Sequence, residues 1–563
     1  MPDTATPNDR TKPRASGGAR VAMIVLMNWS RYAVMLGVSL VMTPMLLGAM
    51  RIDLFGLYMF FNLVRFALQD LTQPLLTREL AAAWASDKPD VRRRAFSSAA
   101  AVSLLAAVIA AVLGWLAVQF GAGLLNTPEG SLPTVRLMIG CEAAMLVMML
   151  GAAPSINLFM ASHRVVENNF HRTFERLGDL VVAIPVIYLL HVDVVRWYVV
   201  GRVVFRAVHV GVCVVRARML ERDARAALAS VDRELVGHYS DAMKWSASLP
   251  ISNQFYWYID QVLLNLFFGA VFNGVYGIIN QLRGYARILG GGLFMGAEGM
   301  TADMHERGQH DFTRRLMLTA MRSSVAITAI CTVLVAGFVG PLMYAWLGAK
   351  LETDQALKDA GVSVQEVVSI VWCFFLIMAP AIPVIEGGCS AITILFGVGR
   401  LRQFAPALLV MTLMKLLLTW LALWMAVGHW GRGSIQLAAW VTSITSIAMY
   451  GVYLPFLVKR AMGIGVMEQY RRVYLWPLVS VLPIGALAWA MATYLGPWPH
   501  GAVSMIKLAA CAGVAGVAWL PLAVVLIPEE YERQRVIGML ERIGGRIPGM
   551  GMPVGMLRRA WKV

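Results

Sequence analysis

Long apolar runs recur from one end of this chain to the other, and they limit its possible folds more than any other feature. Each run is about 20 residues long, the length an α-helix needs to cross a hydrocarbon core of roughly 30 Å. Hydrophobic residues make up 58% of the chain and charged residues only 15%, which a soluble fold could not bury. The sequence therefore predicts an all-α integral membrane protein, because lipid offers no hydrogen-bond partner to an open backbone.

We predict about 14 transmembrane helices, of which the fifth and sixth are short. The predicted spans lie near residues 21–48, 54–76, 97–120, 135–160, 174–192, 195–215, 247–269, 271–298, 317–347, 366–389, 404–428, 434–458, 473–496 and 502–527.

The Lys and Arg residues between the spans set the orientation. With the N-terminus inside, the predicted cytoplasmic segments carry most of the 49 Lys and Arg residues, and every alternation agrees. Both termini are thus predicted to be cytoplasmic, and the polar tail 1–20 lacks the apolar core of a signal peptide. The net charge of +16 reflects orientation and contact with anionic membrane lipids. Nucleic-acid binding is not expected, because the basic residues are dispersed over many short loops.

Two stretches of the chain repeat the same pattern. "FGLYMFFNLVR" at 55–65 and "NGVYGIINQLR" at 273–283 align without a gap, and "LFMASHR" at 158–164 is echoed by "LFGVGR" at 395–400. Two halves of six spans each return the chain to the same side of the membrane. We therefore expect parallel repeats related by an axis along the membrane normal, with a binding site between them.

The predicted organisation follows from this repeat. Two pseudosymmetric six-helix lobes enclose a central cavity, and two C-terminal helices are added to them. The segments are a cytoplasmic tail 1–20, an N-lobe 21–217, an amphipathic cytoplasmic linker 218–246, a C-lobe 247–460, a helix pair 461–528 and a basic cytoplasmic tail 529–563.

Polar side chains form one stripe on each repeated helix. Tyr58, Asn62 and Arg65 share the spacing of Tyr276, Asn280 and Arg283, and Arg287 continues the second stripe. The first span adds Arg31. A charge facing lipid at this depth costs at least about 2.5–3.5 kcal/mol, so we expect these side chains to line a wet, cationic cavity. Guanidinium groups in such a cavity would bind phosphate oxygens.

Internal ion pairs are the alternative explanation of these arginines, with Asp260 and Arg283 as one candidate pair. Asp70 and Asp260 are too few to neutralise the whole set. Either aspartate is instead a candidate for binding a coupling H⁺ or Na⁺, and the membrane potential could also drive an anionic cargo.

Catalytic and metal sites are not predicted. The six cysteines fall singly within or beside apolar runs, and the nine histidines form no cluster in the sequence. No catalytic triad and no nucleotide-binding glycine loop is visible, so we expect no cofactor and no enzymatic activity.

The order of several phrases resembles the multidrug/oligosaccharidyl-lipid/polysaccharide (MOP) exporter superfamily, in particular polysaccharide flippases of the Wzx type and the related lipid II flippase MurJ. The phrases are "MTPMLLGAMRIDLFGLYMFFN" at 42–62, "LLTRELAAA" at 75–83, "IDQVLLNLFFGAVFNGVYGIIN" at 259–280, "MYAWLG" at 343–348 and "ILFGVGRLRQF" at 394–404. The eighth span departs from the pattern, because it ends in "RILGGGLFMGAEGM" without a proline, and glycine flexibility would replace the proline bend.

This resemblance implies alternating access and a specific cargo. The cargo would be an undecaprenyl-pyrophosphate-linked oligosaccharide, a polysaccharide repeat unit moved from the inner to the outer leaflet of the bacterial inner membrane. In MurJ-like members arginines on the first, second and eighth spans line the cavity, and Arg31, Arg65, Arg283 and Arg287 lie on those spans here. A monomer would suffice, and glycan polymerase or export machinery are candidate partners.

Four other functions remain open. A lipid II flippase would use the same cationic site, whereas a drug or ion antiporter of the multidrug (MATE) type would need acids for its cationic cargo. A membrane glycan polymerase or ligase would need a large outer loop, and the longest one here, 348–365, is short. A transport-inactive scaffold in a glycan-synthesis complex is the last alternative.

Overall fold

The computed structural model describes residues 17–69, 71–86, 88–162, 164–190, 193–291, 301, 304–305, 308–400, 403–529, 532–534 and 537. These residues are almost entirely helical, and none of them forms a β-strand. The all-α fold predicted from the apolar runs is therefore confirmed.

The first half of the chain contains nine of the helices described. Their bounds are α1 Gly17–Ala49, α2 Ile52–Gln69, α3 Gln73–Trp84, α4 Pro89–Leu116, α5 Ala122–Leu124, α6 Leu132–Gly151, α7 Ala153–Ala161, α8 Val165–Pro185 and α9 Val194–Leu220. The predicted span 54–76 ends early, because α2 stops at Gln69 and α3 begins at Gln73.

The second half of the chain continues this pattern. Its helices are α10 Arg233–Phe268, α11 Ala270–Gly291, α13 His310–Met343, α14 Ala349–Thr353, α15 Gln355–Asp359, α16 Val364–Met378, α17 Ala381–Gly397, α18 Ala405–Trp430, α19 Ile435–Ser446, α20 Leu454–Met462, α21 Val466–Gln469, α22 Trp476–Tyr494 and α23 Ala502–Leu526. The glycine-rich end of the eighth span, which was predicted to bend, falls largely on residues 292–300, and these lie outside the described residues.

Eight helical segments within the described part are long and apolar enough to cross a membrane, and α16 with α17 makes a ninth if this pair, bent by 51°, is one span. One of the eight, Ala405–Met462, has 58 residues and contains both α18 and α19, which is enough for two crossings. The chain is thus a multi-pass membrane protein. The number of 14 spans stays a prediction.

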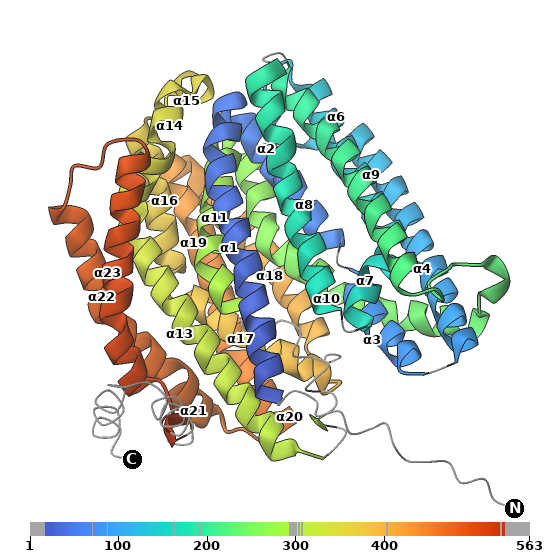
Figure 1. Cartoon of the computed structure of the whole chain (residues 1–563). Helices are drawn as coiled ribbons and strands as arrows, with labels where there is room; N and C mark the ends of the chain where they lie inside the picture. Colours follow the sequence, from blue (N-terminus) through green and yellow to red (C-terminus); the bar gives the residue numbers. More distant parts are fainter. Residues whose placement is uncertain are drawn as a thin grey trace, which may run out of the picture.

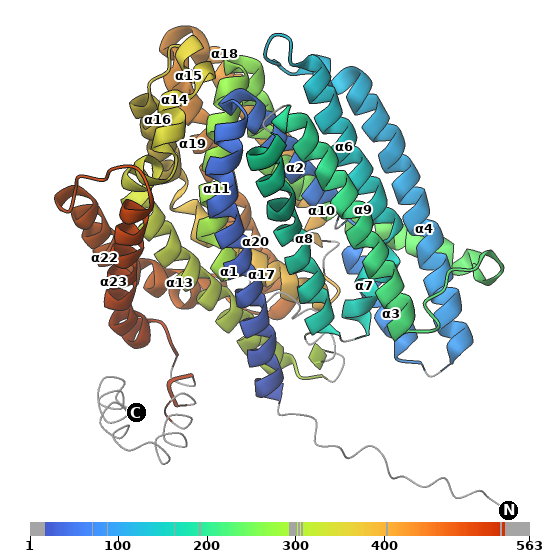
Figure 2. The same ribbon diagram turned by 45° about the horizontal axis from the view of Figure 1, so that its top comes forward.

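The helices form two groups on either side of α1, α2 and α11 (Figure 1). In the first group α4 packs on α6, α6 on α9, and α8 on α9, whereas in the second group α13 packs on α17, α10 on α18, and α16 on α19. The rotated view keeps the same division (Figure 2). We call the first group, with α2, the N-lobe, and the second group, with α11, the C-lobe.

The repeated helices α2 and α11 pack against each other between the two lobes. Their contact is made by Gly56 and Gly274, which are equivalent positions of the repeat. A Cβ atom on Gly56 would lie 2.6 Å from the Cα atom of Gly274, and one on Gly274 would overlap the carbonyl of Ile52. Only glycine lets the two backbones approach this closely.

The helix α10 joins the two halves of the chain. Its N-cap is Asp232, whose carboxylate accepts hydrogen bonds from the backbone N–H groups of Glu234 and Leu235. Of the predicted amphipathic linker 218–246, residues 233–246 are continuous with the seventh predicted span, since α10 runs unbroken for 36 residues. Gly269 alone connects α10 to α11, with a φ of 88° that favours glycine.

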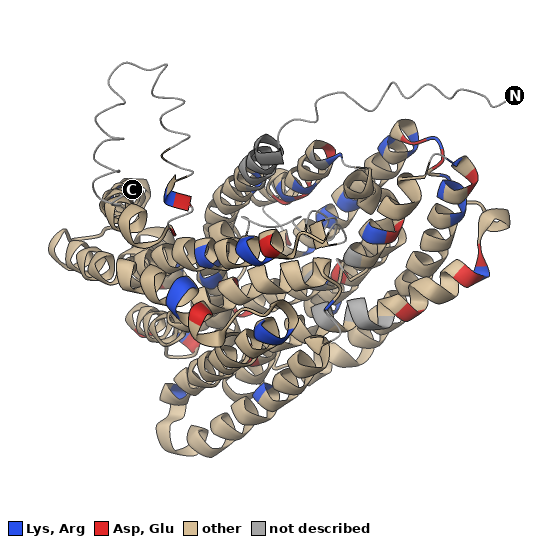
Figure 3. Cartoon of the chain, turned by 90° about the horizontal axis from the view of Figure 1, so that it is seen from below, with Lys and Arg blue, Asp and Glu red and all other residues tan. Residues whose placement is uncertain are grey.

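The C-terminal pair α22 and α23 packs on α13, outside the two lobes. The helices α1 and α23 begin and end, respectively, at the same end of the bundle (Figure 1), as an even number of spans requires. We call this the predicted cytoplasmic end. Viewed from that end, most of the ribbon carries no charged residue (Figure 3), so the charges inside the bundle need individual explanations.

Candidate functional site: arginines between the lobes

The polar stripe of α11 begins at a buried ion pair inside the C-lobe. The Tyr276 hydroxyl donates a hydrogen bond of 3.0 Å to Asp260, and the Lys415 ammonium lies 2.8 Å from the same carboxylate. Asp260 and Lys415 are both completely buried. Thr442 donates a further hydrogen bond of 2.6 Å to Asp260. Asp260 is therefore neutralised by Lys415 of α18, not by Arg283.

The stripe of α2 points into the N-lobe. The Arg65 guanidinium lies 2.6 Å from Glu142 of α6 and donates hydrogen bonds to Asn62 and Gln69. The Tyr58 hydroxyl is 3.0 Å from the hydroxyl of Tyr198 on α9. These α2 side chains are buried and have partners within their own lobe. Substrate contact by Tyr58, Asn62 and Arg65 stays a prediction, and in this structure the Arg65 guanidinium is already occupied.

A ladder of ion pairs joins α8 to α9 next to Arg65. Asp179 accepts from Arg202 at 2.9 Å, and Glu175 lies 2.6 Å from Arg206. Arg202 also pairs with Glu142. The acids recur at every fourth position of α8 and the arginines at a matching spacing on α9, so successive pairs lie one helical turn apart. Burial of these charges is tolerated because each is paired.

The count of acidic partners made from the sequence was incomplete, although it still leaves arginines without an acidic partner among the described residues. It counted only Asp70 and Asp260, but Glu142, Glu175 and Asp179 lie within the predicted N-lobe spans and bind arginines there. In the C-lobe Arg287 pairs with Glu386 of α17. Each missed acid lies on a different helix from its arginine, so the stripe on one helix could not reveal the pairing.

Arg283 differs from the arginines of this network. It is 5% exposed, and no carboxylate of a described residue lies within 4.0 Å of its guanidinium. Instead the group lies over the ring of Trp257, with its Cζ atom 4.5 Å from the ring centre. Arg287 lies over the same ring at 4.8 Å. A stacked guanidinium keeps its N–H edge available for an anion.

The N-lobe repeats this arrangement around Phe66. The Cζ atom of Arg176 lies 3.6 Å from the centre of the Phe66 ring, and that of Arg65 lies 3.9 Å from it. Arg176 likewise has no carboxylate within 4.0 Å among the described residues. It was missed because it lies at the edge of the predicted span 174–192 and was counted with the cytoplasmic charges, whereas it lies well inside α8.

Arg176 of α8 and Arg283 of α11 are the two arginines that combine these features, since each lies over an aromatic ring. Arg176 and Arg283 belong to different lobes and neither has an acidic partner in the described part of the chain. We call these two residues the inter-lobe arginine pair.

The remaining predicted site residues lie at the borders of this region. Arg31 of α1 donates a hydrogen bond of 3.4 Å to Asn169 of α8 and lies over the ring of Tyr32. Asn280 donates to Gln261 of α10 at 3.4 Å. Asp70 lies outside the described residues, so its assignment as an ion-binding group stays a prediction.

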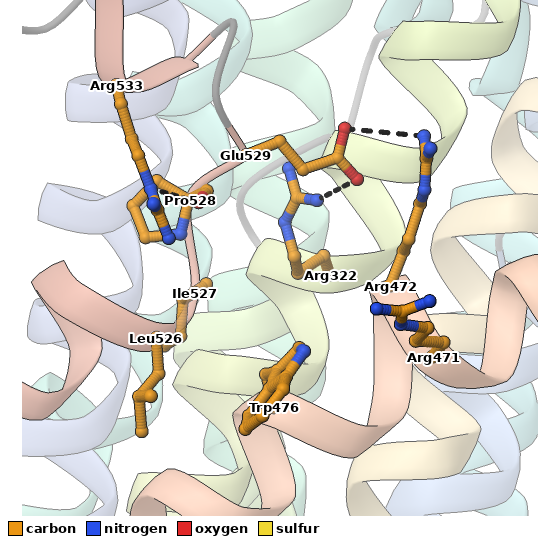
Figure 4. A pocket seen from close by; sticks show the side chains of 9 residues that line it. All are labelled: Arg322, Arg471, Arg472, Trp476, Leu526, Ile527, Pro528, Glu529 and Arg533. Carbon is orange, nitrogen blue, oxygen red and sulfur yellow. Dashed lines mark hydrogen bonds and ion pairs between the residues drawn. The ribbon is translucent and has the colours of Figure 1, made fainter. Parts of the chain in front are cut away.

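Two cavities lie away from the inter-lobe arginine pair. One, of about 590 Å³, lies between α22 and the chain that follows α23, and Glu529 there binds Arg322 and Arg472 (Figure 4). The other, of about 370 Å³, lies between α13, α16 and α22. Neither is lined by a predicted site residue. The central cavity between the lobes therefore stays a prediction.

No protein-family model matches this sequence, and no curated protein matches it either. Solved structures do match. The lipid II flippase MurJ in an inward closed conformation gives a TM-score of 0.62 at 10% identity, covering 90% of this chain and 98% of MurJ. A MATE transporter from Vibrio cholerae gives 0.53 at 13% identity, covering 78% of this chain and 98% of that one.

A MOP superfamily transporter from Pyrococcus furiosus, described as having a binding pocket of reverse polarity and a suggested different function, gives 0.53 at 11% identity and covers 79% of this chain and 95% of that one. At such identities the likeness concerns the fold alone. The fold implied by the resemblance to the MOP superfamily is thereby confirmed, whereas the Wzx subtype is not tested.

Proposed function

We propose that this chain is a MOP-type transporter that flips an undecaprenyl-pyrophosphate-linked oligosaccharide across the bacterial inner membrane. The observation that carries the proposal is the inter-lobe arginine pair, two cations without acidic partners in the described chain, one on each lobe. The match to MurJ also covers 90% of this chain, against 78–79% for structures of MATE transporters. The additional part of this chain that the MurJ match covers is comparable in length to the C-terminal helix pair.

The chemistry of the pyrophosphate suits these arginines. Its oxygens accept paired hydrogen bonds from guanidinium groups, which lysine cannot offer in the same geometry. The guanidinium groups of Arg283 and Arg176 lie over the rings of Trp257 and Phe66, and the rings do not occupy the N–H edges that would donate to the anion. Arg287 lies over the same Trp257 ring and adds positive potential, although it is paired with Glu386. We include Arg31 of α1 in the proposed site.

Electrostatics also links binding to lobe movement in this proposal. Arg176 and Arg283 carry like charges on opposite lobes, and like charges in a low-dielectric region repel each other. A bound pyrophosphate offsets that repulsion and draws the lobes together around it, while the polyprenyl tail remains in lipid. Rocking about the Gly56–Gly274 contact then exposes the head group to the other side. No covalent step is required, so the proposed activity is transport and not catalysis.

The source of energy follows less directly from the residues. Sodium binding at Asp260 would have to displace Lys415, whose ammonium already occupies that carboxylate. We therefore favour the membrane potential acting on the anionic cargo, or proton movement within the Asp260–Lys415 pair. We further propose that both termini are cytoplasmic, that a monomer is sufficient, and that a glycan polymerase or export complex receives the product.

Lipid II and a polysaccharide repeat unit are two related candidate cargoes, and the experiment described below distinguishes them. Lipid II shares the pyrophosphate, so the arginines alone do not separate it from a polysaccharide repeat unit. A MATE-type cationic drug is disfavoured, because it would be repelled by Arg176, Arg283 and Arg287.

The test is to remove the gene and follow the lipid-linked intermediates of the cell. The proposal expects a polysaccharide intermediate to accumulate in the inner leaflet, and the purified protein in vesicles to translocate that lipid. Normal glycan export and no translocation by the purified protein would overturn it. Efflux of a cationic dye would favour the MATE-type alternative, and translocation of lipid II alone would redirect the proposal to peptidoglycan synthesis.

A further inference from the structure

Three metal-binding side chains lie together in the N-lobe, outside the proposed transport site. His171 belongs to α8, and His209 and Cys213 lie one turn apart on α9. Their donor atoms are all within 4.8 Å of one another, and all three side chains are buried. The Cys213 sulfur is 3.4 Å from His171 Nδ1 and 3.5 Å from His209 Nε2.

We propose that His171, His209 and Cys213 bind a divalent transition-metal ion such as Zn²⁺. A tetrahedral ion with a metal–sulfur distance of about 2.3 Å and metal–nitrogen distances of about 2.0–2.1 Å separates sulfur from nitrogen by about 3.5–3.6 Å. Both sulfur–nitrogen distances in the cluster are close to this value. The sulfur thus has the spacing of a shared ligand to both histidines, whose donor atoms lie within 4.8 Å of each other, and a fourth position is left for water or another group.

The donor types define the class of metal. One thiolate and two imidazoles suit Zn²⁺ and copper, whereas Ca²⁺ and Mg²⁺ require oxygen ligands. A buried thiol is only a weak hydrogen-bond donor and has one proton, so it can donate to only one of the two imidazole nitrogens at a time. Binding of the ion releases that proton, because the ligand is the thiolate.

The position of the cluster explains what the ion would do. By helix rise, His171 lies about 9 Å from the start of α8 and Cys213 about 10 Å from the end of α9. Glu167 and Arg216 form an ion pair on the side toward those ends, and Glu175 and Arg206 form one on the other side. The metal would therefore be a further link between α8 and α9, placed between two ion pairs, and it would fix these two helices of the N-lobe to each other.

No metal site was predicted from the sequence, because the three ligands are not grouped along the chain. The spacing of His209 and Cys213 is four residues, which places both on one helical face. The third ligand, His171, is 38 positions before His209 and comes next to it only through the packing of α8 on α9.

Metal analysis of the full-length purified protein tests the proposal. The protein is purified in detergent with a tag that contains no histidine, stripped with a chelator, and titrated with Zn²⁺ or with Co²⁺, whose thiolate complexes absorb light. We expect about one ion per chain, a thiolate–Co²⁺ absorption band, and a higher Tm with Zn²⁺. Cys213→Ser and His209→Gln should each abolish the band and the Zn²⁺-dependent rise in Tm.

The control is Cys511→Ser, which removes a buried cysteine of α23 far along the chain from the cluster and should leave the band unchanged. Gel filtration shows whether each variant is folded. Absence of stoichiometric binding by the wild-type protein would overturn the proposal. Unchanged binding in both Cys213→Ser and His209→Gln would also overturn it, whatever the outcome of the transport experiments.

Discussion

Gly56 and Gly274 occupy equivalent positions of the internal repeat and touch each other where α2 meets α11. A Cβ atom on Gly56 would come within 2.6 Å of Gly274 Cα. The repeated sequence and the contact between its two copies therefore have one cause. Both helices need a residue without a side chain at the place where the lobes meet, and the proposed rocking of the lobes uses this contact as its pivot.

Substitution of either glycine should weaken this contact. Gly56→Ala or Gly274→Ala forces the two backbones apart, and overpacking of this kind costs about 1–3 kcal/mol. We expect a lower thermal unfolding midpoint in detergent, together with slower transport. Gly284→Ala is the matched control, because a Cβ atom there meets nothing within 4 Å on the same helix α11. Equal midpoints for all three variants and the wild type would show that the close contact is not needed.

The Asp260–Lys415 pair should be essential to the C-lobe. Lys415→Ala leaves a completely buried carboxylate without its counter-charge, and loss of one partner of a buried pair costs about 3–5 kcal/mol. We expect a large fall in the unfolding midpoint. Since the vacated carboxylate can accept another cation, NaCl should raise the midpoint of the variant more than choline chloride does, and should not do so for the wild type.

The neutral pair Asp260→Asn with Lys415→Met separates charge from packing. It should be more stable than Lys415→Ala, because no buried charge is left alone. If the wild type is itself stabilised specifically by Na⁺, then Lys415 does not fill the site as described.

The Arg65–Glu142 pair should be structural. Glu142 neutralises both Arg65 and Arg202, so Glu142→Gln leaves two buried guanidinium groups with less negative charge nearby. We expect a loss of stability of about 3–5 kcal/mol, seen as less folded protein in gel filtration and a lower midpoint. The exposed Glu129 of the same lobe provides the control, Glu129→Gln. A fully stable Glu142→Gln variant would mean that the N-lobe network contributes little.

His500 should give the loop between α22 and α23 a dependence on pH. Its Nδ1–H donates to the carbonyl of Tyr344, and its Nε2 lies 3.1 Å from Glu352. First the carbonyl and then Glu352 raise the pKa of His500 above its ordinary value of 6.5. A raised pKa means that the contact stabilises the folded state fully below pH 6.5 and is lost as the pH rises through the folded-state value.

An NMR titration of His500 checks this expectation. Glu352→Gln should lower the pKa of His500 only in part, because the Tyr344 carbonyl is the larger cause of the shift. A His500 pKa at or below 6.5 in the wild type would contradict the contact.

The fold was largely predictable from the chain, whereas the ion pairs were not. Apolar runs and repeated phrases depend on positions along one helix. The helices and the repeat that relates α2 to α11 were therefore predictable from the sequence. The partner of Asp260 is 155 positions away on α18, and Glu142 meets Arg65 only because α6 packs on α2. Such pairs depend on which helices are neighbours, and one sequence does not contain that information.

Arg283 shows the same division within the candidate site. Its depth and its place in the repeat were predictable from spacing. That it lacks an acidic partner in the described chain while the equivalent Arg65 has one depends on the surrounding helices. Arg176 was overlooked because it lies at the edge of a predicted span and was counted with the cytoplasmic charges, and its place over Phe66 depends on the packing of α8 near α2.

The most direct test is the rate at which the purified protein moves an undecaprenyl-pyrophosphate glycan across vesicles when Arg283 or Arg176 is changed to alanine. Hydrogen bonds to charged groups contribute about 1.5–3 kcal/mol, so each variant should be slower by at least about tenfold at equal amounts of folded protein. Arg283→Lys should keep part of the rate, and Arg136→Ala, an exposed arginine of α6, should keep all of it. Wild-type rates for both Arg283→Ala and Arg176→Ala would contradict the proposal that these two arginines bind the cargo between the lobes.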